Sequence, residues 1–482
     1  MSKHLPAHLS YRLAVLLLGA IMSGCVSLEP RNKPVPLPVA DAWPADAIAA
    51  TTVPPGTVAA ADIGWHEFFV DPRLQQLIAL ALANNRDLRV AVLNVDKARA
   101  VYRVQRAARV PAIEATGTMS RQRSYSPLRT PSGDYPFSEV DAANLSVAAF
   151  EFDLFGRVRS LSRSALQQYL ATAEARRAAQ LTLIAEVANA WLTLAADHEL
   201  QQLAASTLAN QEDAFHLTQQ KYDHGAVSGL DLAQAETTVQ SARADAARYD
   251  GSVAQDRNAL TLLVGVTPDA ALLPGALDQP VTGLTPLPAG LPSTVLLRRP
   301  DVLQAEHVLR AANASIGAAR AAFLPSISLT GSVGTASDDL SGLFKAGNRT
   351  WSFVPQIDLP IFQGGRLLAG LAGARADRDI AVARYEGAIQ SAFREVTDAL
   401  ALTQTLQRQR EADEQLAAAS ARAYQLSDER YRAGRDSYLT LLVAQRSDYA
   451  ARQSLIAIRL AEQSNRVSLY KVLGGGWREH TP

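Results

Sequence analysis

The sequence predicts an α+β membrane protein in which a unit built from a β-hairpin and a very long helix occurs twice. Three observations predict this class. The chain of 482 residues resembles itself when it is shifted by 209 residues. Each copy contains segments in which apolar and polar residues alternate, and each contains a stretch of 66 residues without proline. Self-similarity at a fixed offset indicates a duplicated structural unit.

Matched residues locate the two copies. The 209-residue shift places KYDHGAVSGLDLAQA (221–235) on RYRAGRDSYLTLLVA (430–444), so that Gly225 coincides with Gly434. Nearer the N-terminus the shift becomes 214, which places Asp87 on Asp301. We expect a signal peptide over 1–24, a lipidated tether over 25–70, the two repeats over 71–265 and 293–474, an equatorial linker over 266–292 and a tail over 475–482.

The N-terminus carries the features of a secretory signal peptide. Lys3 and Arg12 precede the short apolar run Leu13–Met22, and small residues follow. Ile-Met-Ser-Gly-Cys resembles the lipobox of bacterial lipoproteins, so Cys25 is expected to become a lipidated N-terminus; the alternative is a chance cysteine in a cleaved leader. Because Cys25 is the only cysteine, no disulfide can form within the chain.

Long helices are predicted between the strands. A first helix is expected from Pro72 to about Val110, and helices over 157–222 and 366–431 would each be about 100 Å long at 1.5 Å per residue. The first of these two long helices has two apolar seams rather than one: Leu181, Ile184, Ala188, Trp191 and Ala195, and Leu183, Val187, Ala190 and Leu194. Two seams favour a neighbour on each side, as in a closed helical cylinder, whereas a two-stranded coiled coil needs one.

Strands are predicted where the period changes to two. In the first copy these are 113–120 and 144–154, separated by a polar loop over 126–140; in the second copy one strand begins near Ile327 and the returning strand places Trp351, Phe353 and Ile357 on one face. This alternation is what a membrane β-barrel strand requires, although a soluble two-sided sheet would also show it.

Four strands are too few to close a barrel, for which about eight are needed. An open sheet edge in lipid leaves backbone groups unpaired at several kcal/mol each. We therefore expect a homotrimer that shares one barrel of twelve strands and twelve helical columns.

Composition excludes several classes of function. The chain has no P-loop, no G-x-S-x-G and no H-E-x-x-H motif, and its eight histidines are scattered along the sequence. We therefore expect no enzyme, no cofactor and no metal site. Lys and Arg number 47, as do Asp and Glu, and no basic stripe is present. Nucleic acid is therefore not an expected partner.

Several stretches then carry a family resemblance: WHEFFVDPRLQQLIALALANNRDLRVA (65–91), FDLFGR (152–157), LRRPDVLQAE (297–306), PIFQGGR (360–366) and NRVSLYKVLGGGW (465–477). The chain resembles TolC-like outer membrane efflux factors, in their OprM-like lipoprotein branch, over nearly the whole mature chain. The resemblance implies a homotrimer with a 12-stranded barrel in the outer membrane of a Gram-negative bacterium, continued by a periplasmic α-helical barrel.

The family also implies a function and partners. The chain would be the passive exit duct of a tripartite efflux pump for small molecules or drugs. Its partners would be a periplasmic membrane fusion (adaptor) protein, an inner-membrane transporter of the RND type, and outer membrane lipids. The alternative is a non-channel periplasmic helical scaffold lipoprotein, which would need no alternating hairpins.

The same resemblance assigns roles at the closed end of the helical barrel. A hydrogen bond between Tyr431 and Asp231 is expected to hold the closed state. Leu439, Val443 and Arg446 are spaced i, i+4, i+7 and share one helical face, which the family turns toward the pore; the alternative is that Leu439 packs between helices.

At the tips, adaptor contacts are expected at Gly225, Ser228, Gly434 and Ser437. The aligned positions of the family's carboxylate rings carry Thr440 and Val443 here, which argues against strong cation selectivity.

Overall fold

The computed structural model describes residues 28–31, 36–41, 43, 62–123, 137–277, 281–282 and 293–481. These residues form two compact units. One, the sheet unit, includes Val95–Thr172 and Ala305–Tyr385; the other, the tip unit, includes Pro36–Asn94, Ala173–Gln304 and Glu386–Pro482. The expected signal peptide and Cys25 lie outside the described residues.

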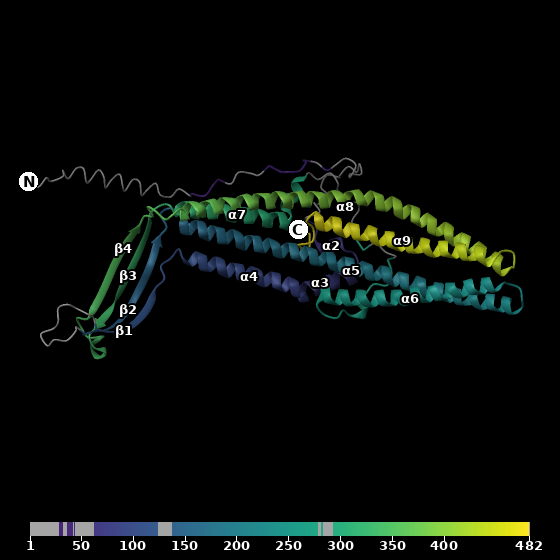
Figure 1. The fold of residues 1–482 in the computed structure, drawn as a ribbon, viewed down its shortest axis with the longest axis horizontal. Helices are drawn as coiled ribbons and strands as arrows, with labels where there is room; N and C mark the ends of the chain where they lie inside the picture. The colour runs from purple at the N-terminus through teal and green to yellow at the C-terminus, as the bar shows by residue number, and fades with distance from the viewer. Residues whose placement is uncertain are drawn as a thin grey trace, which may run out of the picture. The chain divides into compact units, whose positions relative to one another are not determined.

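The predicted duplication is confirmed by the order of elements. The strands are β1 (Glu114–Arg123), β2 (Phe137–Phe152), β3 (Ser326–Ser337) and β4 (Arg349–Asp358). The α-helices are α2 (Trp65–Phe68), α3 (Pro72–Asn84), α4 (Arg86–Ala107), α5 (Arg157–Asp223), α6 (Gly229–Val264), α7 (Pro300–Ala321), α8 (Arg366–Arg432) and α9 (Tyr438–Val472). Short 3₁₀ turns are η3 (Ala270–Leu272), η4 (Ser293–Arg298) and η5 (Leu340–Gly342). The series α4, β1, β2, α5, α6 recurs as α7, β3, β4, α8, α9 (Figure 1).

The long helices have the predicted extent. α5 and α8 are each 67 residues long, one residue more than the sequence indicates. All but one of the residues of the two seams of α5 are buried, and Ala190 is half-buried. α5 also contains an 18-residue stretch that is apolar enough to cross a bilayer, but 56% of it is buried within the chain. This stretch is therefore part of the core.

The expected single helix from Pro72 to about Val110 is wrong, because the chain breaks at Asn85. Asn85 is extended, at φ −61° and ψ 132°, and its Oδ1 accepts a 2.8 Å hydrogen bond from the amide of Leu88 at the start of α4. Its Nδ2 donates to the carbonyl of Leu263 at 2.8 Å. Gly265 ends α6 beside it at φ 82°, where a Cβ atom would lie 2.5 Å from the carbonyl oxygen of Asn84. The break therefore lets the end of α6 approach the backbone between α3 and α4.

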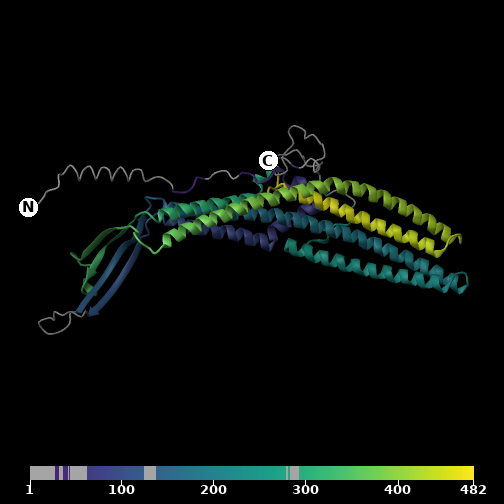
Figure 2. The ribbon, with the colours of Figure 1, turned by 45° about the horizontal axis from the view of Figure 1, so that its top comes forward.

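The four strands form one antiparallel sheet in the order β1-β2-β3-β4, side by side in Figure 2. Its register separates the side chains by polarity, as two neighbouring rows show. One row is apolar: Ala115, Leu145, Val333 and Trp351. The next row points to the opposite face and is polar apart from its glycine: Thr116, Asn144, Gly334 and Thr350. Around these rows the sheet is thus apolar on one face and polar on the other, as predicted.

The largest difference from the expected strand boundaries lies at the start of β2. β2 begins at Phe137 rather than Asn144, because its first residues pair with the end of β1: Phe137 lies opposite Arg123 and Val140 opposite Ser120. The predicted polar loop over 126–140 therefore extends four residues too far. Cross-strand pairing determines where β2 begins. The polar composition of residues 126–140 gives no local sign of it.

The core of the tip unit surrounds Trp191 of α5. Its indole nitrogen donates to the carbonyl of Leu272 in η3 at 3.2 Å. Nearby, the rings of Phe68 and Tyr470 stack with their centroids 3.8 Å apart, and the Tyr470 hydroxyl donates to the carbonyl of Ile63 at 2.7 Å. Burial raises the pKa of Tyr470. α2 and α9, the first and last of the described helices, are therefore joined in one apolar cluster.

Candidate functional site

The two helical hairpins of the tip unit, α5–α6 and α8–α9, end in matching turns (Figure 2). Gly225 and Gly434 adopt φ values of 66° and 72°, a region that strains residues with a side chain. In each turn the glycine amide donates three residues back, to the carbonyl of Tyr222 at 2.8 Å and of Tyr431 at 3.0 Å. This shared backbone requirement explains why the sequence repeat contains glycine at both positions.

The two predicted tip serines cap the returning helices. Ser228 accepts a 3.2 Å hydrogen bond from the amide of Asp231, whose carboxylate accepts from the Ser228 amide at 3.0 Å and hydroxyl at 2.7 Å. This is a reciprocal capping box. Ser437 accepts from the amide of Thr440 at 3.3 Å. Asp231 is therefore engaged in local helix capping.

Tyr431 lies inside the hairpin assembly, with 3% of the residue exposed. Its hydroxyl is 3.1 Å from the hydroxyl of Thr218. The Lys221 ammonium lies 3.9 Å from the centroid of its ring, and the Tyr438 ring meets it edge-on at 5.7 Å. This network fixes the Tyr431 ring between the two hairpins.

The expected hydrogen bond between Tyr431 and Asp231 is not formed within one chain. The Tyr431 hydroxyl is paired with Thr218, and the Asp231 carboxylate accepts from Ser228. A lock between them would need both residues to leave these partners or to meet across subunits. It stays a prediction about the assembled channel. The sequence patterns did not point to Thr218, since a threonine inside a long helix carries no local signal.

The expected aperture residues share one unpacked face of α9. Leu439 is 55% exposed and Val443 is 57% exposed, and Arg446 is also exposed. Between them on the helix, Leu441 and Leu442 are buried at 2% and 5% exposure. Within a single chain the helix therefore presents Leu439, Val443 and Arg446 away from its own core.

An ion pair braces the second tip. Arg430 holds Asp436 across the Gly434 turn through two hydrogen bonds of 2.6 and 2.9 Å. These hydrogen bonds lower the pKa of Asp436. The first tip has Lys221 and Val227 at the equivalent positions, so its turn lacks the same pair. The sequence did not indicate this difference, which makes the second tip the more polar and better braced of the two.

Comparison with known proteins identifies the family to which this architecture belongs. The profile of the outer membrane efflux protein family matches residues 77–266 and 291–475. The toluene efflux pump outer membrane protein TtgC of Pseudomonas putida is 48% identical over 469 residues, covering 97% of this chain and 96% of that protein. The antibiotic efflux pump outer membrane protein ArpC, also of Pseudomonas putida, shows 48% identity with coverage of 97% and 96%.

Solved structures agree. The open state of the MtrE outer membrane channel of Neisseria gonorrhoeae matches with a TM-score of 0.85 at 40% identity, covering 95% of this chain and 100% of that one. The matches confirm the TolC-like channel fold, with its duplicated strand pairs and long helices, and a non-enzymatic role in the outer membrane of a Gram-negative bacterium. The chain therefore belongs to the outer membrane efflux protein family, as the channel component of an efflux pump.

Proposed function

We propose that three copies of this chain close one 12-stranded barrel, continued by a periplasmic helical barrel, to form a passive exit duct. The observation that carries this is the sheet: it has one apolar face, and among the described residues neither β1 nor β4 pairs with a further strand on its outer edge. Such edges must be paired in a membrane, because lipid offers no hydrogen-bond partner. A non-channel scaffold would leave both the apolar face and the edges unexplained.

The duct works within a tripartite pump, with a periplasmic membrane fusion adaptor and an inner-membrane transporter of the RND type. We infer that the adaptor meets the tips at Gly225, Ser228, Gly434 and Ser437. At both glycines no atom lies within 4 Å of the position that a Cβ would take, which leaves the turns open to a partner. Because two relatives are named for toluene and antibiotic efflux, the inferred cargo is aromatic solvents and antibiotics.

The N-terminus is inferred to carry a lipid on Cys25, on the lipobox-like sequence around it. Several acyl chains on one cysteine anchor a protein stably, where a single chain would not. The anchor would then supplement the barrel in the outer membrane. The repeat, linker and tail boundaries expected from the sequence stand as part of the same proposal.

The closed end is inferred to narrow at Leu439, with Val443 and Arg446 on the same face. Their exposure on a single chain leaves this face available to line a pore. A ring of leucines around an axis can exclude water and so close a pore by dewetting. Tyr431 and Asp231 are inferred to bias this end toward the closed state when neighbouring helices meet.

Two measurements on purified protein test the proposal. Native mass spectrometry in detergent should give the mass of a trimer, and planar-bilayer recording should show discrete conductance steps. In cells, deletion of the gene should raise sensitivity to toluene and antibiotics, and the wild-type gene should restore tolerance. A monomeric barrel, or trimers that conduct no ions even when the tips are opened by mutation, would refute the duct.

A further inference from the structure

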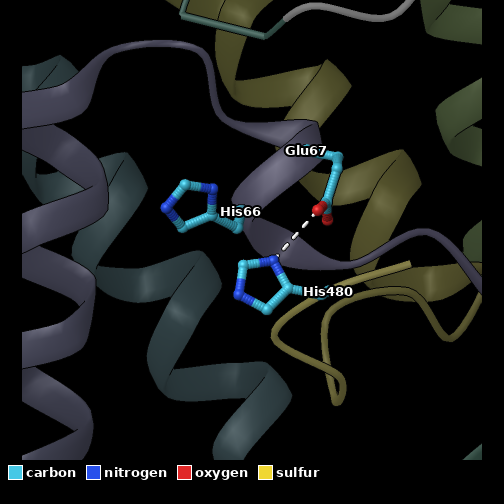
Figure 3. Close-up of side chains that lie close together, drawn as sticks. All are labelled: His66, Glu67 and His480. Atoms are coloured by element: carbon cyan, nitrogen blue, oxygen red, sulfur yellow. Dashed lines mark hydrogen bonds and ion pairs between the residues drawn. The ribbon is translucent and has the colours of Figure 1, made fainter. Parts of the chain in front are cut away.

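Two histidines and a glutamate meet where α2 and the C-terminal tail come together. His66 and Glu67 belong to α2, and His480 belongs to the C-terminal tail (Figure 3). The Nδ1 atom of His480 lies 3.0 Å from a carboxylate oxygen of Glu67. The rings of His66 and His480 have centroids 5.1 Å apart. One ligand atom from each of the three residues lies within 4.8 Å of the others.

The backbone holds the tail in this place. The amides of Trp65 and His66 donate to the carbonyls of Arg478 and Glu479, each at 3.1 Å. The Gly64 amide donates to the Thr481 hydroxyl, also at 3.1 Å. The cluster is therefore positioned by main-chain pairing and does not rest on side-chain contacts alone.

Gly64 is needed for this approach. A Cβ atom at this position would lie 2.4 Å from a carboxylate oxygen of Glu67 and 2.5 Å from the carbonyl oxygen of Glu479. Contacts this short are essentially never seen for a real Cβ, so a side chain here would push the tail away. Glycine at this position thus allows the tail to approach α2 closely enough for the three side chains to converge.

The carboxylate of Glu67 is oriented by two groups of the C-terminal tail, the His480 imidazole and the Thr481 amide. The Thr481 amide donates to the second carboxylate oxygen at 3.2 Å, which leaves the first oxygen to face His480. An oriented carboxylate beside two imidazoles is a set of ligands that suits a transition metal ion.

We propose that His66, Glu67 and His480 form a binding site for a divalent transition metal ion, with Zn²⁺ as the best-matched probe. Zn²⁺ accepts imidazole nitrogen and carboxylate oxygen at about 2.0–2.2 Å, which sets neighbouring ligand atoms about 3.4 Å apart in a tetrahedron. The His480–Glu67 pair, at 3.0 Å, is about 0.4 Å closer than this, so the two atoms need only a small separation to admit the ion. The His66 ring closes the remaining gap by rotating its side chain, which is partly exposed, and a water completes the coordination.

The proposed ligands come from the two segments that the main-chain pairing joins, α2 and the C-terminal tail. A bound ion would then link α2 to the C-terminal tail, across 413 residues of sequence.

Metal binding to the folded form alone would raise the stability of the channel. This inference is independent of the pump's cargo and of the channel's conductance, so it can fail while the proposed function stands. The competing account is a plain imidazole–carboxylate hydrogen bond that clasps the tail without an ion.

The test uses purified full-length trimers that carry no polyhistidine tag, since a tag beside His480 would supply ligands of its own. After chelator treatment and dialysis, zinc titration by calorimetry and elemental analysis should give one Zn²⁺ per chain at micromolar Zn²⁺. His66→Ala and His480→Ala should weaken binding at least about tenfold, because each removes one of three ligands. His224→Ala is the matched control, since His224 is an exposed histidine at the first tip outside the cluster.

Stability and spectroscopy provide further readouts. Zn²⁺ should raise the thermal midpoint of the wild type and of His224→Ala but not of His480→Ala, and Co²⁺ should give the visible absorption of a low-coordinate site only where the cluster is intact. If His480→Ala alters folding, Glu67→Gln keeps the tail's hydrogen-bond acceptor and should still lose the metal. Equal zinc binding by the wild type and His480→Ala, or no binding by the wild type, would overturn the site.

Discussion

Replacing Leu439 with alanine separates a pore-lining leucine from a packing leucine, and α9 provides its own control two residues away. Leu439 is 55% exposed in the single chain, whereas Leu441 is 2% exposed within a cluster that includes Tyr431 and Tyr438. The two variants remove the same atoms from the same helix turn. Any difference between them therefore reports the surroundings of the side chain.

The structure gives the expected magnitudes. Truncating a buried leucine costs about 2–5 kcal/mol, because the lost transfer free energy is joined by a cavity term. Leu441→Ala should thus lower the free energy of unfolding by this amount. Burying a whole leucine is worth about 1.5–3 kcal/mol, and since more than half of Leu439 remains exposed, its truncation should cost about 1 kcal/mol or less.

Single-channel recording and thermal unfolding of purified trimers measure both effects. Leu439→Ala should raise the conductance of the closed channel and leave the thermal midpoint nearly unchanged, because a shorter side chain widens a hydrophobic constriction. Leu441→Ala should lower the midpoint and leave conductance unchanged. The reasoning is refuted if Leu439→Ala destabilises the trimer as much as Leu441→Ala and does not change the conductance, since Leu439 would then be a packing residue between subunits.

Three further predictions follow from the same structure. Tyr431→Phe should lower the free energy of unfolding by about 0.5–1.5 kcal/mol, because the hydrogen bond to Thr218 is lost. If Tyr431 also locks the tips, the variant should raise resting conductance and antibiotic sensitivity. Thr218→Val removes only the partner within the chain and should not open the channel, so equal effects of the two variants would count against the lock. Desolvation and the neighbouring Asp197 carboxylate raise the pKa of Asp256 to about 6 from an ordinary value of 3.8. The folded state therefore binds the proton on Asp256 more tightly than the unfolded state. The stabilisation of the folded state by this proton is complete below pH 3.8 and is lost as the pH rises through about 6. Asp256→Asn should raise the thermal midpoint at neutral pH and flatten its dependence between these values; an unchanged profile would show that the pair does not share a proton. Cys25→Ser should abolish palmitate labelling while trimers still form, and label retained on the variant would place the lipid elsewhere.

The overall architecture could be predicted because its signals are local and repeated. Residues 157–222 lack proline and carry apolar seams at helical spacing, which indicates a long helix. The positive φ of Gly225 and Gly434 explains why a glycine recurs at each turn. Alternating polarity identified strands with one apolar face, because successive side chains of a strand point to opposite sides. The resemblance to a family with these elements then placed the expected aperture on α9.

Long-range contacts determine the element boundaries that the sequence did not predict. The break at Asn85 depends on a hydrogen bond to Leu263, and the start of β2 depends on pairing with Arg123. Neither is visible in the local pattern.

The site residues divide in the same way. Helical spacing was enough to place Leu439, Val443 and Arg446 on one face of α9, since that depends only on the period of the helix. The hydroxyl partner of Tyr431 is a threonine 213 residues away, and His480 meets Glu67 across 413 residues. Periodicity specifies which face of an element a residue occupies, but only the packing of distant elements determines which side chain it meets there.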